Sequence, residues 1–299
     1  RDRLRSRGLG DVYKRQVVEA ASRSEVIIAV VGGSSARDFK TSYQETGAAI
    51  ADEKSISDME CGEGFDRATL TLLGKQQDLL NALKATGKPL IVVYIEGRPL
   101  DKVWASEYAD ALLIASYPGQ EGGYAIADVL FGDYNPAGRL PVSVPRSVGQ
   151  IPVYYNKKAP CNHDYVEQAA SPLYTFGYGL SYTTFEYSDL QVMRKSPCYF
   201  EVSFKVKNTG SYDGEEVAQL YLRDEYASVV QPLRQLKCFE RFFLKRGEEK
   251  EIFFTLTEKD LSIIDRNMKR VVETGDFRIM IGASSDDIRL TKDISVESL

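Results

Sequence analysis

Three short apolar runs in the first half of the chain constrain its fold more than any other feature. They are residues 25–33 (EVIIAVVGG), 89–97 (PLIVVYIEG) and 109–117 (ADALLIASY). Continuous apolar runs bounded by turn residues are typical of strands buried in a parallel sheet. The sequence therefore predicts three such strands.

Segments with helical spacing accompany these runs. In residues 74–86 three leucines recur on one helical face, and Gly87 follows the last turn, as expected at a helix C-terminus. Helices are also predicted at residues 100–108 and 119–131, and residues 17–22 are predicted to end another helix. Alternating strands and helices indicate a parallel sheet with right-handed crossovers and helices on both faces.

Ligands bind beyond the carboxyl ends of the strands in sheets of this kind. The loops expected there are residues 32–66, 96–99 and 118–123. The first loop is long and polar and lacks periodicity, which in a compact domain often marks a functional segment. Its end, residues 60–67 (ECGEGFDR), combines four charged residues with two glycines. We therefore place the candidate site in this stretch.

The hydrophobic pattern changes to a period of two in the second half of the chain. Residues 200–206 (FEVSFKV) alternate cleanly between apolar and polar side chains. Such strands, separated by polar turns, favour an antiparallel sandwich of two sheets. Before them, residues 146–182 are rich in proline and aromatic residues and are predicted to pack along the surface as a linker. Further strands are predicted at residues 216–223, 234–243, 251–256, 275–282 and 288–296.

Length and composition fit two domains, each with a core of its own. The 299 residues carry a net charge of -5, and 43% of them are hydrophobic. The sequence has no basic stripe and no zinc-finger spacing, so no nucleic acid partner is expected. No apolar run reaches membrane-spanning length, so no membrane partner is expected either. Four widely spaced cysteines are predicted to be free thiols: Cys61, Cys161, Cys198 and Cys238.

Neither a cofactor nor a metal is expected. His163 is the only histidine, so no histidine-based metal site and no Ser–His–Asp triad can be built around a second one. A Gly-Gly-Ser-Ser turn at residues 32–35 follows the first strand. No Gly-x-Gly-x-x-Gly motif accompanies it, and no Lys-Ser or Lys-Thr pair follows it.

Residues 1–16 do not resemble the start of a folded protein. They contain five arginines, and they lack an initiator methionine and the apolar core of a secretion signal. Residues 11–16 (DVYKRQ) resemble a translated sequencing adaptor. We interpret residues 1–16 as a non-native segment in front of a gene cut upstream, with a basic disordered tail as the alternative.

Several motifs, in order, resemble one family. Residues 117–123 (YPGQEGG), 127–132 (ADVLFG) and 135–141 (NPAGRLP) closely resemble the α/β sandwich domain of glycoside hydrolase family 3. Residues 176–183 (FGYGLSYT) look like that family's link to its last domain. The segments that resemble its fibronectin type III-like domain are residues 206–210, 220–221, 236–239 and 275–277.

This resemblance implies a fold class and a domain order. The fold is expected to be α/β plus all-β, with a parallel-sheet α/β sandwich in residues 17–158 and an aromatic linker in residues 159–182. An antiparallel fibronectin type III-like β-sandwich is expected in residues 183–299. Family members usually begin with a (β/α)8 barrel that carries the nucleophilic aspartate, and no such segment is present. The chain is therefore expected to be a C-terminal fragment that is inactive by itself.

The resemblance also selects Glu63 as the general acid/base. The family often places this residue as Gly-Glu-Gly followed by an aromatic, and residues 62–67 (GEGFDR) match that pattern. Cys61 stands where serine is common. Glu60 is the rival carboxylate, but it lacks the flanking glycines.

Two carboxyl groups about 5 Å apart carry out hydrolysis in retaining glycosidases. One attacks the sugar carbon, and the other needs a raised pKa so that it can protonate the leaving oxygen. Asp66 and Arg67 are placed to fix the loop or to bind sugar hydroxyls, and a loop-bracing ion pair between them is the alternative. Asp38 and Arg37 follow the first strand and are further candidates for contacts with the sugar.

The resemblance implies an exo-acting β-glycosidase that hydrolyses terminal β-linked sugars, with β-glucosidase activity first and β-xylosidase activity second. The implied partners are an oligosaccharide or β-glycoside substrate and the missing barrel of the same protein. Relatives of this kind are commonly exported in bacteria, which implies a periplasmic or secreted location. The alternative from a different class is a carbohydrate-binding or domain-packing module without activity of its own.

Overall fold

The computed structural model describes residues 7–35, 44–46, 61, 66–158 and 163–297. By compactness the chain divides into two units. Unit 1 comprises Arg1–Ala127 and Pro145–Ile151, and unit 2 comprises Asp128–Val144 and Pro152–Leu299. The domain boundaries predicted after residues 16, 158 and 182 stay predictions.

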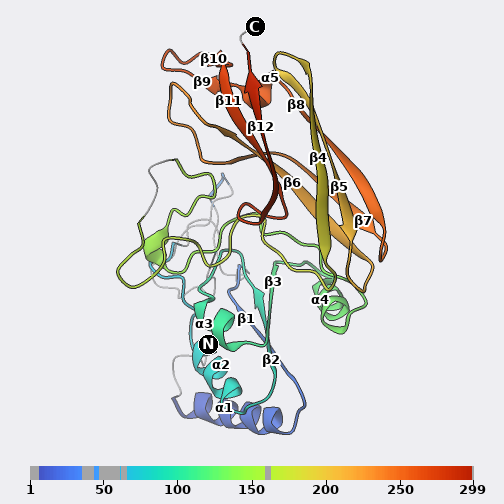
Figure 1. The fold of residues 1–299 in the computed structure, drawn as a ribbon. Coiled ribbons are helices and arrows are strands. Elements are labelled where there is room, and N and C mark those ends of the chain that lie inside the picture. Colours follow the sequence, from blue (N-terminus) through green and yellow to red (C-terminus); the bar gives the residue numbers. More distant parts are fainter. Residues whose placement is uncertain (1–6, 36–43, 47–60, 62–65, 159–162, 298–299) are drawn as a thin grey trace. The chain divides into compact units, whose positions relative to one another are not determined.

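A parallel sheet of three strands forms the centre of unit 1, as the three apolar runs predict. Its strands are β1 (Ile27–Gly32), β2 (Leu90–Ile95) and β3 (Ala111–Ser116), in the order β1-β2-β3 (Figure 1). The helices that accompany them are α1 (Arg7–Ser22), α2 (Gln76–Lys84), α3 (Val103–Tyr108) and α4 (Gly122–Phe131). Helix α1 therefore includes part of the segment interpreted as non-native, and that interpretation stays a prediction.

The core of unit 1 lies on one face of this sheet. Leu80 and Leu83 of α2 and Ala105 of α3 are buried there against the inward side chains of β1 and β2. Those inward side chains are Ile27, Ala29, Val31, Leu90, Val92 and Tyr94.

The prediction that all three strands are buried is wrong for the other face of β1. Ile28 and Val30 are 43% and 61% exposed, so β1 alternates between buried and exposed side chains and is not buried on both faces. β2, in contrast, is buried along most of its length. An apolar run predicts a strand, but the burial of each face of that strand depends on which elements pack against that face.

Unit 2 contains an antiparallel sandwich of two sheets, as the alternating pattern predicts. One sheet has the strand order β12-β11-β6-β7 and the other has the order β4-β5-β8 (Figure 1). The strands are β4 (Phe185–Ser196), β5 (Tyr199–Asn208), β6 (Gly214–Asp224), β7 (Gln235–Leu244), β8 (Glu249–Leu256), β11 (Gly275–Gly282) and β12 (Ile288–Val296).

Alternate side chains from both sheets fill the sandwich core. Phe204, Leu220, Ile279 and Leu256 are among the fully buried members of this core. Smaller elements complete the unit: α5 (Glu258–Leu261), β9 (Ile263–Ile264) and β10 (Arg270–Val271). Neither these elements nor β4 were predicted from the sequence.

The segment before the sandwich also belongs to unit 2. Leu140 and Val144 exchange backbone hydrogen bonds with the stretch from Leu173 to Tyr178. The motif at residues 135–141 therefore lies beside the motif at residues 176–183. A side chain at Gly179 would have its Cβ 2.1 Å from the carbonyl oxygen of Gly138, so this close approach requires glycine.

Part of the predicted aromatic linker is packed as expected. Tyr155 stacks on Phe176 with 4.2 Å between ring centroids and meets the edge of Tyr221. Tyr174 stacks on Tyr178. Tyr154, in contrast, is 64% exposed, so the packing extends to only some of these rings.

Candidate active site

The loops that follow the three parallel strands meet at the carboxyl edge of the unit 1 sheet. Tyr117, which follows β3, brings its hydroxyl oxygen within 2.5 Å of the sulfur of Cys61. The same hydroxyl donates to the carbonyl oxygen of Gly33, after β1, at 3.1 Å. In the contact between Tyr117 and Cys61, either the hydroxyl or the thiol can be the donor.

Gly97, after β2, lies against the side chains of Cys61 and Tyr117. We call these residues, together with Gly33, the Cys61 junction. A Cβ at position 97 would lie 2.5 Å from a ring carbon of Tyr117 and 2.8 Å from the Cys61 sulfur. Only glycine leaves room for both side chains. The backbone amide of Cys61 also donates to the carbonyl of Ser34 at 3.3 Å, which ties residue 61 to the loop after β1.

The surroundings of the Tyr117 hydroxyl favour its neutral form. Burial, with a further contribution from the hydrogen bond to Cys61, raises the pKa of the Tyr117 phenol. The phenol is therefore protonated at neutral pH and serves as a hydrogen-bond donor. Cys61 itself is only 5% exposed. These features fit a structural anchor better than a reactive thiol.

A buried ion pair lies in the loop after β2. The Nζ of Lys102 lies 2.6 Å from Oε1 and 2.8 Å from Oε2 of Glu96, with side chains 0% and 5% exposed. Lys102 also donates to the Leu100 carbonyl, and the Leu100 amide donates to Glu96. Burial raises the pKa of Glu96 and lowers that of Lys102, while their mutual attraction opposes both shifts. The pair therefore fixes the shape of this loop.

Of the predicted site residues, the structure describes Asp66 and Arg67. Asp66 is exposed and Arg67 is partly buried. Arg67 donates from Nη2 to the Thr71 carbonyl at 2.5 Å, and its Nη1 is buried without a hydrogen-bond partner in the described chain. No ion pair joins Asp66 to Arg67 among the described contacts, and the loop-bracing alternative stays a prediction. Glu63, Glu60, Asp38 and Arg37 lie outside the described residues.

Of the described residues of this loop, Cys61 lies at the sheet edge, where it contacts Tyr117, and Arg67 bonds locally to Thr71. Sequence reasoning named the loop but missed Tyr117, Gly97 and the Glu96–Lys102 pair. The only signal for the pair was a Glu and a Lys on either side of the segment Gly-Arg-Pro-Leu-Asp.

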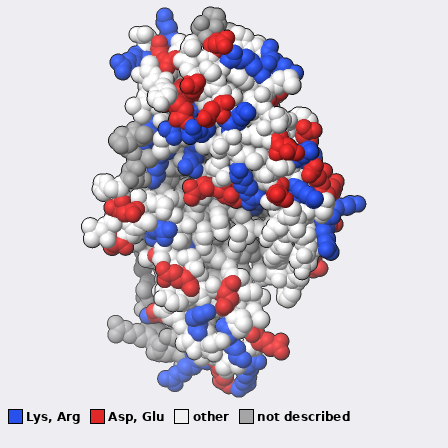
Figure 2. All heavy atoms as spheres, viewed as in Figure 1, with Lys and Arg blue, Asp and Glu red and all other residues white. Residues whose placement is uncertain are grey.

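Three further observations bear on the class of protein. Across the described ranges, no group of three or more His, Cys, Asp or Glu residues is placed to hold a metal ion. No helix in the described part of the chain has the length and apolarity needed to cross a membrane. Basic and acidic side chains are interspersed on the face shown in Figure 2.

Comparison with known protein families gives two matches. Residues 2–182 match the glycosyl hydrolase family 3 C-terminal domain, and residues 216–285 match the fibronectin type III-like domain. Each match falls on a part of the chain where the corresponding fold is seen. The first match alone covers more than half of the chain.

Characterised relatives agree with these matches. A periplasmic β-glucosidase of Salmonella typhimurium is 42% identical over 290 residues, which are 92% of this chain and 35% of the relative. A β-xylosidase of Formosa agariphila is 41% identical over 283 residues, again 92% of this chain and 36% of the relative. The chain thus spans about a third of the length of these relatives.

Solved structures show the same likeness. A β-glucosidase from Erythrobacter marinus matches with a TM-score of 0.85 and 35% identity over 98% of this chain and 37% of that chain. A β-glucosidase from Listeria innocua in complex with glucose matches with a TM-score of 0.82 and 32% identity, over 95% of this chain and 38% of that chain. The chain therefore belongs to glycosyl hydrolase family 3, with the C-terminal domain of that family followed by a fibronectin type III-like domain.

Proposed function

We propose that this chain is the C-terminal part of a retaining, exo-acting β-glycosidase and that Glu63 is its general acid/base. The observation that carries the proposal is the position of Cys61, two residues before Glu63 in the sequence. In a family 3 chain, the thiol of Cys61 contacts Tyr117 at the carboxyl edge of a parallel sheet, where ligands bind, and Arg67 follows six residues later in the sequence. The segment between them contains a carboxylate flanked by glycines.

The proposed chemistry needs a carboxyl group from outside this chain. A carboxylate nucleophile, expected on the missing barrel, attacks the anomeric carbon while Glu63 gives its proton to the glycosidic oxygen. The leaving sugar departs as an alcohol and a glycosyl ester remains. Glu63, now ionised, takes a proton from water as the water oxygen attacks the anomeric carbon, and the nucleophile is released. The chain by itself is expected to be inactive.

Anchoring at the Cys61 junction would contribute to this role by limiting the positions that Glu63 can adopt. General acid catalysis requires the acid within hydrogen-bond reach of the leaving oxygen, so small displacements of the loop are costly. Asp66, Arg67, Asp38 and Arg37 are proposed to contact sugar hydroxyls. The Nη1 of Arg67, which has no hydrogen-bond partner among the described residues, is a donor available for such a contact.

The substrate is proposed to be a β-glucoside, with a β-xyloside as the alternative, since both activities occur among the relatives. A periplasmic or secreted location is proposed from the name of the Salmonella relative. The competing function is a module that binds carbohydrate or packs against another domain without taking part in catalysis.

The test compares variants of the full-length enzyme, with its native upstream sequence restored. Glu63→Ala is expected to reduce kcat/KM on substrates with poor leaving groups by about 10²- to 10⁴-fold, and far less on activated aryl β-glucosides. Added azide should restore turnover of the aryl substrate. Glu60→Ala is the matched control and should change both rates little. Equal losses on both substrates without azide rescue would contradict the acid/base role.

A second measurement addresses the fragment itself. The purified 299-residue chain is expected to show no turnover of an aryl β-glucoside. Robust turnover by this chain would show that it contains its own nucleophile, and the proposal that the nucleophile lies elsewhere would then be wrong.

A further inference from the structure

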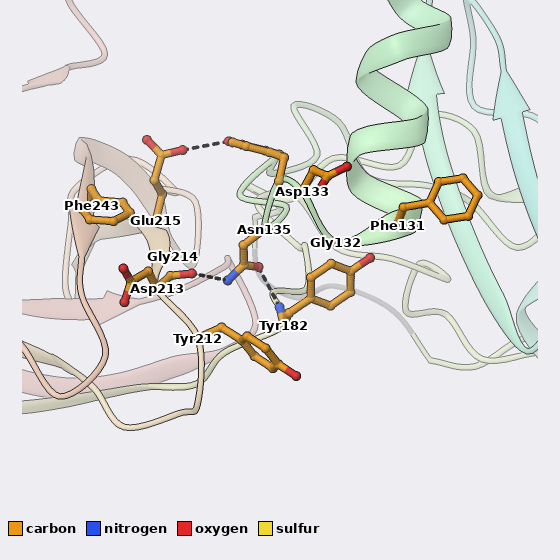
Figure 3. Close-up of a pocket in the computed structure, with 11 residues that line it drawn as sticks. Phe131, Gly132, Asp133, Asn135, Tyr182, Tyr212, Asp213, Gly214, Glu215 and Phe243 are labelled. Atoms are coloured by element: carbon orange, nitrogen blue, oxygen red, sulfur yellow. Dashed lines mark hydrogen bonds between the residues drawn. The ribbon is translucent and has the colours of Figure 1, made fainter.

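A pocket in unit 2 is lined by aromatic and acidic side chains. It has a volume of about 700 Å³, and all of its lining residues belong to unit 2 (Figure 3). This volume lies within the range of about 300–1,000 Å³ that is typical of small-molecule sites. The lining residues are Phe131, Gly132, Asp133, Tyr134, Asn135, Tyr182, Tyr212, Asp213, Gly214, Glu215 and Phe243.

Five aromatic rings around this pocket are exposed to solvent. A group of exposed rings in one place, bordered by polar residues, is typical of a binding surface and unlike the scattered apolar residues of an ordinary surface. Phe131 is 77% exposed, Tyr212 62%, Phe243 53%, Tyr182 47% and Tyr134 41%.

The centre of the pocket is held rigidly by Asn135. Its amide nitrogen donates to the carbonyl of Asp213 at 2.9 Å, and its amide oxygen accepts from the backbone of Tyr182 at 2.8 Å and from Ser181 (Figure 3). The hydroxyl of Tyr182 donates to the carbonyl of Val129 at 2.7 Å. Asn135 thus joins two distant stretches of the chain, and the lining is organised before any ligand arrives.

A second hydrogen-bond network engages Glu215, one of the acidic residues that line the pocket. The hydroxyl of Tyr134 donates to Glu215 at 2.7 Å and accepts from Arg241 at 2.6 Å, and Arg241 also pairs with Glu215. Glu215 is therefore neutralised by its neighbours. Asp133 and Asp213 are exposed, and the bond given to Asp213 comes from the backbone of Arg246, which leaves acceptor capacity on that carboxylate.

This chemistry favours a neutral ligand rich in hydroxyl groups. Carboxylates accept hydrogen bonds from hydroxyls and repel phosphates and other anions. Aromatic rings suit a flat apolar face, and a β-linked glucose or xylose unit presents one because its substituents are equatorial and only C–H groups point above and below the ring. We propose that this pocket, formed by residues of unit 2 alone, is a second carbohydrate site that binds β-linked gluco- or xylo-oligosaccharides. The choice of β-linked sugars rests on the proposed function.

The test is a calorimetric titration of the 299-residue chain with cellotetraose and, separately, with xylotetraose. Tyr212→Ala and Phe243→Ala each remove one exposed ring, and each is expected to weaken binding by roughly tenfold, as when a contact ring is truncated. Tyr226→Ala and Phe253→Ala are the matched controls. Their rings are 82% and 64% exposed and lie outside the pocket, so affinity should stay within about twofold of the parent chain.

Three results would overturn the proposal. The first is binding of neither sugar, and the second is an affinity that Tyr212→Ala and Phe243→Ala leave unchanged. The third is a concentration-dependent dimer that both substitutions abolish, because a second copy of the chain would then occupy the pocket. Thermal unfolding of each variant excludes misfolding as the cause of lost binding.

The same titration separates this proposal from the catalytic one. Glu63→Gln is expected to leave the affinity of the 299-residue chain for both sugars unchanged, because the pocket lies in unit 2. Sugar binding that depends on Tyr212 would stand even if Glu63 were shown not to be the acid/base.

Discussion

The phenol of Tyr117 and the thiol of Cys61 are hydrogen-bonded although 56 residues separate them in the sequence. Through this contact a side chain after β3 fixes the residue that precedes the proposed catalytic segment. The position of Cys61 therefore depends on a loop other than the one that contains it.

Tyr117→Phe removes the hydroxyl and keeps the ring. The substitution breaks the bonds to Cys61 and to Gly33, so the free energy of unfolding should fall by about 1 kcal/mol. The Cys61 thiol should also react faster with a thiol reagent, as followed by mass spectrometry. Tyr124→Phe, at a tyrosine that is 75% exposed on α4, should change neither quantity. Unaltered Cys61 labelling in Tyr117→Phe would argue against the anchoring role.

Gly97→Ala tests the space in the Cys61 junction. The new Cβ meets both the Tyr117 ring and the Cys61 sulfur, so a loss of about 1–3 kcal/mol in the free energy of unfolding is expected. Gly123→Ala is the control: a Cβ there meets nothing within 4 Å, and alanine favours a helix, so α4 should be stabilised by about 0.5–1 kcal/mol. Urea unfolding measures both. Equal stability of the two variants would contradict the close contact.

Lys102→Met should destabilise the chain strongly, because it leaves the carboxylate of Glu96 buried without its partner. We expect a loss of about 3–5 kcal/mol in the free energy of unfolding. Adding Glu96→Gln should recover much of this loss, since glutamine is uncharged and still accepts from the Leu100 amide. Urea unfolding of the single and double variants checks the prediction, and a double variant no more stable than Lys102→Met would contradict it.

Most of the fold was predictable, because strand runs and helical periods are local signals. The observed strands β1, β2 and β3 begin and end only one or two residues inside the ranges predicted for them. β4 was missed because Tyr187 is its only buried side chain and its register shifts between Ser188 and Gln191. An alternating pattern is weak where so few residues face the core.

The site was predictable in location and less so in detail. Glycines and carboxylates at the end of a long loop indicate a functional segment, but they do not reveal which distant side chains hold it. The contact of Cys61 with Tyr117 depends on the paths of two loops, and the space at Gly97 is limited by the side chains of Tyr117 and Cys61. Such contacts have no periodicity in the sequence.

Arg139 makes a buried ion pair in unit 2, with Nη2 2.5 Å from Oε1 of Glu216. Arg139→Met should cost about 3–5 kcal/mol of stability, since it leaves that carboxylate buried and unpaired. Arg139→Lys should cost much less. The Nε of Arg139 is buried without a hydrogen-bond partner in the described chain, and lysine keeps the charge without that donor. Thermal unfolding of both variants measures the difference, and equal losses would contradict this reasoning.

The pair of Glu215 and Arg241 gives a prediction for pH. Hydrogen bonds from Arg241, and then from Tyr134, lower the pKa of Glu215 below its ordinary value of 4.5. The folded chain therefore holds this proton less tightly than the unfolded chain. The contribution of Glu215 to stability is complete above about pH 4.5 and is lost as the pH falls through the folded-state pKa.

Glu215→Gln measures this contribution. Because both side chains are partly exposed, the variant should be less stable than the parent by a few tenths to about 1 kcal/mol at pH 7. The difference should shrink below pH 4.5, as shown by urea unfolding from pH 3 to pH 7. A difference that is constant over this range would mean that the Glu215 charge is not involved.

The contacts of Arg139 and Asn135 within unit 2 determine where the chain can be cut to express the sandwich as a separate piece. The family match ends at residue 182, and a cut there would separate both side chains from the sandwich. The excised piece would retain Glu216 as a buried anion without its cation, and would lose the amide that joins Tyr182 to Asp213. The smallest self-contained piece for expression of the sandwich should therefore begin near Asp128, about fifty residues before the boundary that the family match indicates.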